Sequence, residues 1–155
     1  MRKKHKQQMR IWAMLCHISA LFAWVLLFSL VFIGIPLYLP LNIIAPLLIW
    51  RFKKSKNPWI DFQGKESLNF QISLTLYILI FIIISLIIVL ASFGIAITTN
   101  GASDAVKTIL NSLLWGWMYL IATLMLFQSL LGIFAAKKAY KGEHYRYPLT
   151  IRFLR

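Results

Sequence analysis

Few side chains in this chain could do chemistry, and most of those inside its apolar stretches are amides and hydroxyls. The candidates are His17, Asn69, Gln71, Ser73 and Gln128. His17 follows Arg10 by seven residues, about 10 Å at helical rise, and Gln128 precedes Ala136 by eight, about 12 Å. All five are therefore expected at a similar depth. Such a polar cluster predicts either hydrogen bonds between packed helices or a small vestibule open to one side.

Motifs for catalysis or metal binding are missing from the sequence. It contains no HExxH, no GxSxG, no phosphate-binding glycine loop and no paired cysteines. His5, His17 and His144 lack the spacing of metal ligands, and the four acids form no plausible intramembrane pair. The single cysteine, Cys16, excludes an internal disulfide. We expect a protein that is not an enzyme and that holds no metal or cofactor.

Composition and charge indicate a multi-pass membrane protein. Hydrophobic residues make up 60% of the 155 positions and charged residues only 14%, against about 25% in soluble domains. The net charge of +13 is concentrated before the first apolar run, between the second and third, and after the last. This positive-inside pattern predicts a cell-membrane protein with both termini cytoplasmic, facing anionic inner-leaflet lipids and not nucleic acid.

Four apolar segments, the second inferred from the positive charge on both sides of residues 11–52, predict four membrane spans in a single domain, an all-α bundle. The expected spans cover residues 11–34, 37–52, 66–97 and 109–136, with a cytoplasmic loop at 53–65 and a cytoplasmic tail at 137–155. The second span is short, and Pro46 is expected to kink it; a re-entrant helix is the alternative. Pro36 and Pro40 predict an outer turn, and Asn100-Gly101 an outer loop.

The most polar stretch lies at residues 57–73 and predicts a helix that enters the membrane. Asn57 can cap this helix with Pro58 as its first residue, and Gly142 is expected to stop the last helix. Beyond Gly142, oily and basic residues alternate, which favours an extended tail against the 57–73 helix. The two segments predict either a merely solvated face or a docking surface made of Asp61, Lys65, Glu66, Tyr145, Arg146, Tyr147 and Arg152.

Small residues at helical spacing predict close helix packing at three places. The first seam consists of Ala13, Cys16, Ala20 and Ala23 in the first span. The fourth span carries two small-xxx-small pairs, Ser112 with Gly116 and Gly132 with Ala136.

Five stretches carry a family resemblance over nearly the whole chain. They are His17 and residues 46–50, 61–71, 141–143 and 145–148, of which 64–71 is the most specific part. In these stretches the sequence resembles a family of small bacterial four-span membrane proteins of unassigned function. That family is distantly similar to the twenty-kilodalton chloroplast inner-envelope import component and to a magnetosome membrane protein. Gln63 stands where many relatives have histidine, and Ser67 where alanine is common. The resemblance implies four helices with cytoplasmic termini and no particular substrate.

Three functions are compatible with these features. The first is a non-enzymatic membrane module that assembles as a homo-oligomer or with a membrane-protein partner, in a translocon-like or scaffolding role. The second is a small transporter or oligomeric channel that uses the polar cluster as a vestibule. The third is an immunity or resistance protein against a membrane-active peptide.

Overall fold

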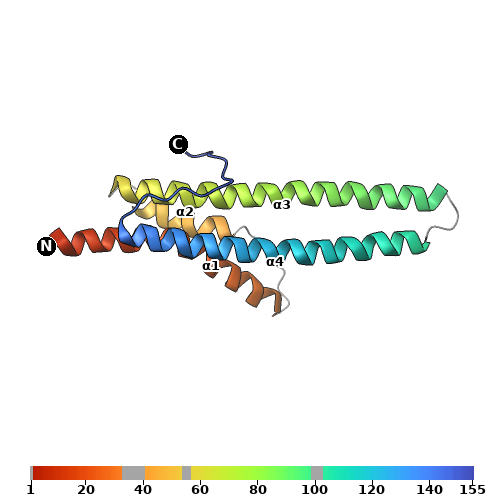
Figure 1. Ribbon diagram of the computed structural model, residues 1–155, viewed down its shortest axis with the longest axis horizontal. Helices are drawn as coiled ribbons and strands as arrows, with labels where there is room; N and C mark the ends of the chain where they lie inside the picture. The colour runs from red at the N-terminus through yellow and green to blue at the C-terminus, as the bar shows by residue number, and fades with distance from the viewer. Residues whose placement is uncertain (1, 33–40, 54–56, 99–102) are drawn as a thin grey trace. The chain divides into compact units, whose positions relative to one another are not determined.

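The chain is built from α-helices. The computed structural model describes residues 2–32, 41–53, 57–98 and 103–155, and these contain α1 (Arg2–Phe32), α2 (Leu41–Lys53), α3 (Pro58–Thr98) and α4 (Ser103–Lys141), followed by a tail without regular structure (Figure 1). The prediction of an all-α chain is confirmed, and each helix covers most of one expected span. The predicted turn at Pro36 and Pro40 and the Asn100-Gly101 loop lie outside the described residues.

Two compact units divide the helices. The first unit comprises Met1–Leu74 and Gln128–Arg155, and the second comprises Thr75–Phe127. The first unit therefore contains α1, α2, the polar start of α3, the end of α4 and the tail. The prediction of a single membrane domain stays a prediction.

The start of α3 has the predicted cap. The side-chain oxygen of Asn57 accepts a hydrogen bond of 2.8 Å from the backbone N–H of Trp59. The Asn57 carbonyl accepts from the N–H groups of Ile60 and Asp61, at 3.1 and 3.2 Å. Pro58 is the first helical residue, where its missing N–H costs nothing. Residues 58–65, assigned above to the loop between spans, are therefore helical and continuous with the apolar run.

The end of α4 is closed by a glycine in the left-handed region. Gly142 has φ +87°, its N–H donates to the Ala139 carbonyl at 3.1 Å, and the N–H of Glu143 donates to the Lys138 carbonyl at 3.0 Å. This pair of bonds is the Schellman motif, which satisfies carbonyls that the helix end leaves unpaired. The predicted helix stop at Gly142 is confirmed.

Small residues let the helices of the first unit approach closely. Ala13, Cys16 and Ala20 of α1 are buried, as is Ala136 of α4. A Cβ built at Gly132 of α4 would lie 3.6 Å from the Leu21 side chain, an ordinary van der Waals contact. Two of the three predicted seams therefore pack inside the unit, although the side chain of Ala23 lies outside the described residues.

The second unit leaves much of its apolar surface uncovered. Phe81 of α3 and Trp117 of α4 meet edge to face at 4.7 Å. Within the described residues, two helices are long and apolar enough to cross a membrane, over Pro58–Ile95 and Asp104–Lys141. Only 6% and 17% of their most apolar stretches are buried inside the chain. Lipid or other helices must cover the remainder.

Candidate functional site

His17 is the centre of a buried hydrogen-bond chain in the first unit. Its Nε2 lies 2.9 Å from the side-chain oxygen of Gln63, and its Nδ1 lies 2.9 Å from the Tyr147 hydroxyl. The Gln63 amide nitrogen donates in turn to the Glu143 carbonyl at 3.1 Å. One chain of bonds thus joins α1, α3 and the tail.

The direction of these bonds follows from the carbonyl at their end. A backbone carbonyl only accepts, so Gln63 must present its NH₂ to Glu143 and its oxygen to His17. His17 Nε2 must therefore carry the proton and donate, which leaves Nδ1 to accept from the Tyr147 hydroxyl. The imidazole is thereby held as one neutral tautomer with both nitrogens occupied.

Aromatic packing holds Tyr147 in this position. Its ring stacks on Phe70 with centroids 4.1 Å apart and planes 7° apart, and Tyr145 meets it edge to face at 5.1 Å. Burial, assisted by the nearby Tyr145, Glu66 and Cys16, raises the pKa of the Tyr147 phenol well above its ordinary value. Tyr147 therefore stays a neutral hydrogen-bond donor at physiological pH.

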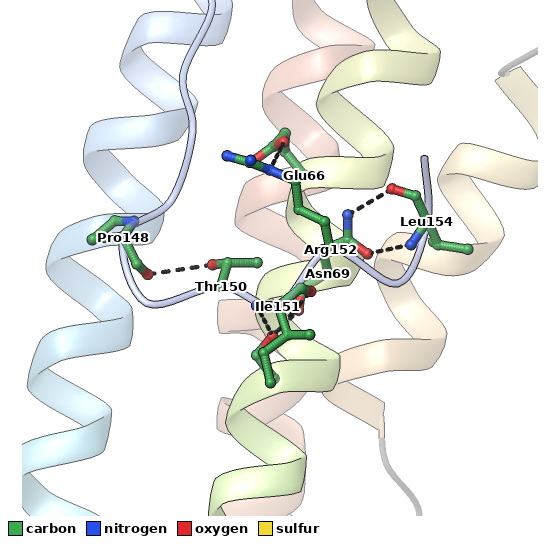
Figure 2. Close-up of polar contacts among 8 residues, drawn as sticks. Glu66, Asn69, Pro148, Thr150, Ile151, Arg152 and Leu154 are labelled. Atoms are coloured by element: carbon green, nitrogen blue, oxygen red, sulfur yellow. Dashed lines mark hydrogen bonds and ion pairs between the residues drawn. The ribbon is translucent and has the colours of Figure 1, made fainter.

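A second set of contacts fixes the rest of the tail to α3 (Figure 2). The Asn69 side chain donates to the Leu154 carbonyl at 2.9 Å and accepts from the Leu154 N–H at 2.8 Å. The N–H of Ile151 donates to the Ser73 hydroxyl at 2.9 Å, and that hydroxyl donates to the Asn69 carbonyl at 2.7 Å. All of these bonds to the tail are made with its backbone groups, and none involves a tail side chain.

An ion pair lies between these two sets of contacts. Nε of Arg152 is 3.7 Å from Oε1 of Glu66, beyond normal hydrogen-bond length (Figure 2). The other carboxylate oxygen of Glu66 is buried without a hydrogen-bond partner in the described structure. Because the Arg152 side chain is 50% exposed, the pair contributes little to tail binding.

A third network connects α2, α3 and α4. The Gln71 side-chain oxygen accepts from the amide groups of Asn42 at 3.3 Å and Gln128 at 3.1 Å. All three side chains are buried. The structure thus distributes the five residues of the predicted polar cluster over three networks, with His17 in the first, Asn69 and Ser73 in the second, and Gln71 and Gln128 in the third.

The residues of the predicted docking surface lie mostly in contacts within the chain. Lys65 and Asp61 form the expected ion pair at 2.7 Å, and the Trp50 indole donates to Asp61 at 2.9 Å. Tyr147 and Glu66 are buried, whereas Tyr145 is half-buried and packs against Phe134 at 5.4 Å. Arg146 and Arg152 are exposed. The tail does lie against α3, but largely through Asn69, Ser73 and Gln63.

Three partners in these networks were not singled out from the sequence as site residues: Gln63, Asn42 and Trp50. The sequence contains one indication that Gln63 matters, because it stands at a position where histidine is common in the resembling family. Trp50 packs over Gly64, where an added Cβ would lie 2.8 Å from the indole Cγ. Trp50 and Gly64 lie in different predicted segments, and nothing in the sequence indicated that they would be in contact.

The three networks consist of hydrogen bonds among buried side chains and backbone groups. Both nitrogens of His17 are engaged in buried hydrogen bonds, so the imidazole cannot bind a ligand without breaking one of them. Among the described residues, no group of three or more His, Cys, Asp or Glu side chains could hold a metal ion. The arrangement stabilises one helix and tail geometry.

Long, uncovered apolar helices and a helix-bonding polar interior define this chain as a helical membrane protein. It belongs to the magnetosome magnetite crystal formation protein family, which it matches over residues 8–154. The predicted resemblance to a magnetosome membrane protein is thereby confirmed, while the likeness to the chloroplast import component stays a prediction. No curated protein and no solved structure matches the chain.

Proposed function

We propose that this protein is a non-enzymatic membrane module that supports magnetite crystal formation by assembling with itself or with a partner membrane protein. Magnetite crystal formation is the process named in the description of the family. One structural observation carries the assembly: the small-xxx-small pair Ser112 and Gly116 on α4 is uncovered, and a Cβ built at Gly116 would meet nothing within 4 Å.

The open pair differs from the other small-residue seams. Gly132 with Ala136, and the Ala13, Cys16 and Ala20 seam of α1, are occupied by packing inside the first unit. Small residues on an uncovered apolar helix allow another helix to approach to backbone contact, which is a main source of helix association in lipid. The remaining pair is therefore suited to a helix of another chain.

The membrane placement that we propose has four helices and both termini on the cytoplasmic side. The distribution of positive charge supports this orientation. With 13 residues, α2 is about 20 Å long, shorter than a hydrocarbon layer of about 30 Å. It is thus a short span or a re-entrant helix.

The buried polar residues favour a role in helix packing and not a role as a transport pathway. His17, Gln71 and Gln128 bond to protein side chains, and each is at least 97% buried. A pathway needs polar groups that face a water-filled cavity. This weighs against the small transporter or channel.

Native mass spectrometry of the protein released from its own membrane, with lipids and partners retained, tests the assembly. We expect a defined complex that Gly116→Leu disrupts while the chain stays folded, because the new side chain has open space. Ala122→Leu is the matched control: Ala122 is also exposed on α4, but Met118 precedes it by four residues and Leu126 follows it by four. A wild-type protein that is monomeric, or equal disruption by both variants, would overturn the assembly mode.

The link to mineral formation needs a cellular measurement. In cells that form magnetosomes, replacement of the gene by the Gly116→Leu variant should change crystal size or number in electron micrographs as deletion does. The Ala122→Leu variant should give wild-type crystals. Wild-type crystals after deletion would contradict the proposed role.

A further inference from the structure

A hollow of about 330 Å³ lies between the start of α1 and the end of α4, within the first unit. It is lined by Lys3, Lys6, Gln7, Arg10 and Tyr140. Lys3 is three and four residues before Lys6 and Gln7, and Arg10 is four and three residues after them. The four residues therefore lie on one face of α1, and Tyr140 lines the hollow from α4.

The lining has the chemistry of an anion site. Three side chains are permanently or normally cationic, the Gln7 amide and Tyr140 hydroxyl add neutral donors, and no acid is among the described lining residues. Lysine ammonium groups and the arginine fork are the donors that bind phosphate oxygens most strongly.

Arg10 is held in place by the end of α4. A Cβ built at Gly142 would lie 2.7 Å from one guanidinium nitrogen of Arg10, so the guanidinium rests directly against this glycine. A helix C-terminus carries partial negative charge and attracts a cation. Arg10 is thereby positioned before any ligand arrives.

The size of the hollow points to a group larger than a simple ion. A volume of 330 Å³ corresponds to roughly ten water molecules and lies near the lower limit of small-molecule sites, about 300 Å³. A hollow of this volume has room for a phosphate with an attached polar group.

The place of the hollow along the chain favours a lipid as the source of that phosphate. Arg10 directly precedes the apolar run of α1, and Tyr140 lies one residue before the end of α4. In the membrane placement proposed above, both residues lie at the cytoplasmic headgroup level, where tyrosine and cations are favoured. We propose that this hollow binds the phosphate headgroup of an anionic phospholipid. The inference rests on that placement and is independent of the assembly through α4.

Lipid binding to the full-length protein in a neutral detergent tests the site. The probe is short-chain phosphatidylglycerol, followed by native mass spectrometry or by a fluorescence titration, with inorganic phosphate as a second titrant. Lys3→Gln/Lys6→Gln/Arg10→Gln removes three lining charges, and Arg51→Gln/Arg146→Gln/Arg155→Gln removes three charges from exposed positions elsewhere. Lys3→Gln/Lys6→Gln, with Arg146→Gln/Arg155→Gln as its control, repeats the comparison without touching the better-packed Arg10.

We expect one saturable lipid on the wild type, with affinity at least tenfold lower in both lining variants and changed less than about twofold in both controls. Each cation is expected to contribute roughly fivefold. Equal weakening in lining and control variants, or no saturable lipid, would overturn the site. Displacement by equimolar inorganic phosphate would overturn the lipid source and assign a free phosphate. Because complex formation is not the readout, failure here leaves the α4 assembly untouched.

Discussion

His17 and Tyr147 are 130 residues apart in the sequence, and their side chains form a buried hydrogen bond of 2.9 Å. This bond attaches the tail to the first helix, while Gln63 attaches the same imidazole to α3. One side chain therefore contacts all three segments, in addition to the bonds that join the tail to α3 directly.

Replacing Tyr147 by phenylalanine tests this bond alone. The Tyr147→Phe ring can still stack on Phe70, but the buried Nδ1 of His17 loses its donor, which costs about 1–3 kcal/mol. We expect a loss of that size in the free energy of unfolding, measured by denaturant titration in detergent micelles. Tyr145→Phe removes the same hydroxyl from a half-buried ring and should cost much less. Equal losses of unfolding free energy in the two variants would show that the bond between His17 and Tyr147 does not stabilise the protein.

Alkaline pH should weaken the first unit through the same residue. Burial raises the pKa of Tyr147 well above 10, whereas the phenol of an unfolded chain ionises near 10. The stabilisation is thus complete below pH 10 and is lost as the pH rises toward the folded-state pKa. Stability measured from pH 8 to 11.5 should be flat and then fall, and Tyr147→Phe should reduce the slope. A remaining slope is expected, because burial also raises the pKa of Tyr145.

Gly64 and Gly116 should respond oppositely to alanine. Both are helical, so alanine should gain about 1 kcal/mol of helix propensity at either position. At Gly64 the added methyl group would meet the Trp50 indole, which is itself bonded to Asp61 and cannot shift without loss. We expect Gly64→Ala to destabilise the protein by about 1–3 kcal/mol and Gly116→Ala to leave it equal or more stable. Melting temperatures in detergent decide between these outcomes, and a stabilised Gly64→Ala would contradict the packing.

The two bonds from Asn69 should protect the tail from proteolysis. Asn69→Ala removes both contacts to Leu154, worth about 1–3 kcal/mol together, so the open tail should be populated at least several-fold more. Trypsin cleavage after Arg152 in inside-out vesicles should accelerate by about tenfold. Asn111→Ala removes an exposed amide from α4 and is the control. Unchanged cleavage in Asn69→Ala would show that other contacts hold the tail.

Local chemistry made the helix ends predictable from the sequence. Asn57-Pro58 and Gly142 act within a few residues of themselves, so the cap of α3 and the stop of α4 followed from residue type. The Asp61–Lys65 pair also lies within one helix turn. In each case, the interaction depends on backbone geometry that the helix itself provides.

The partners of the buried polar residues could not be predicted in the same way. Depth estimates along separate helices placed His17, Asn69 and Gln128 at one level, but they contain no information about which helix face meets which. Gln63 and Asn69 lie about 120° apart around α3 and about 9 Å apart along it, so the rotation and depth of α3 decide which of them His17 meets. The extended tail added further backbone groups as partners for Asn69 and Ser73, and no periodicity reports those pairings.

The long separation of His17 and Tyr147 has a consequence for biosynthesis. Synthesis proceeds at roughly 5–20 residues per second, so the interval between these two residues is about 7–26 s. During that time the imidazole of His17 is already made while its hydroxyl partner does not yet exist. The first unit can therefore close only after α4 has been synthesised. A ribosome that stalls before residue 147 leaves a chain in which His17 can bond to Gln63 but its Nδ1 has no hydroxyl donor.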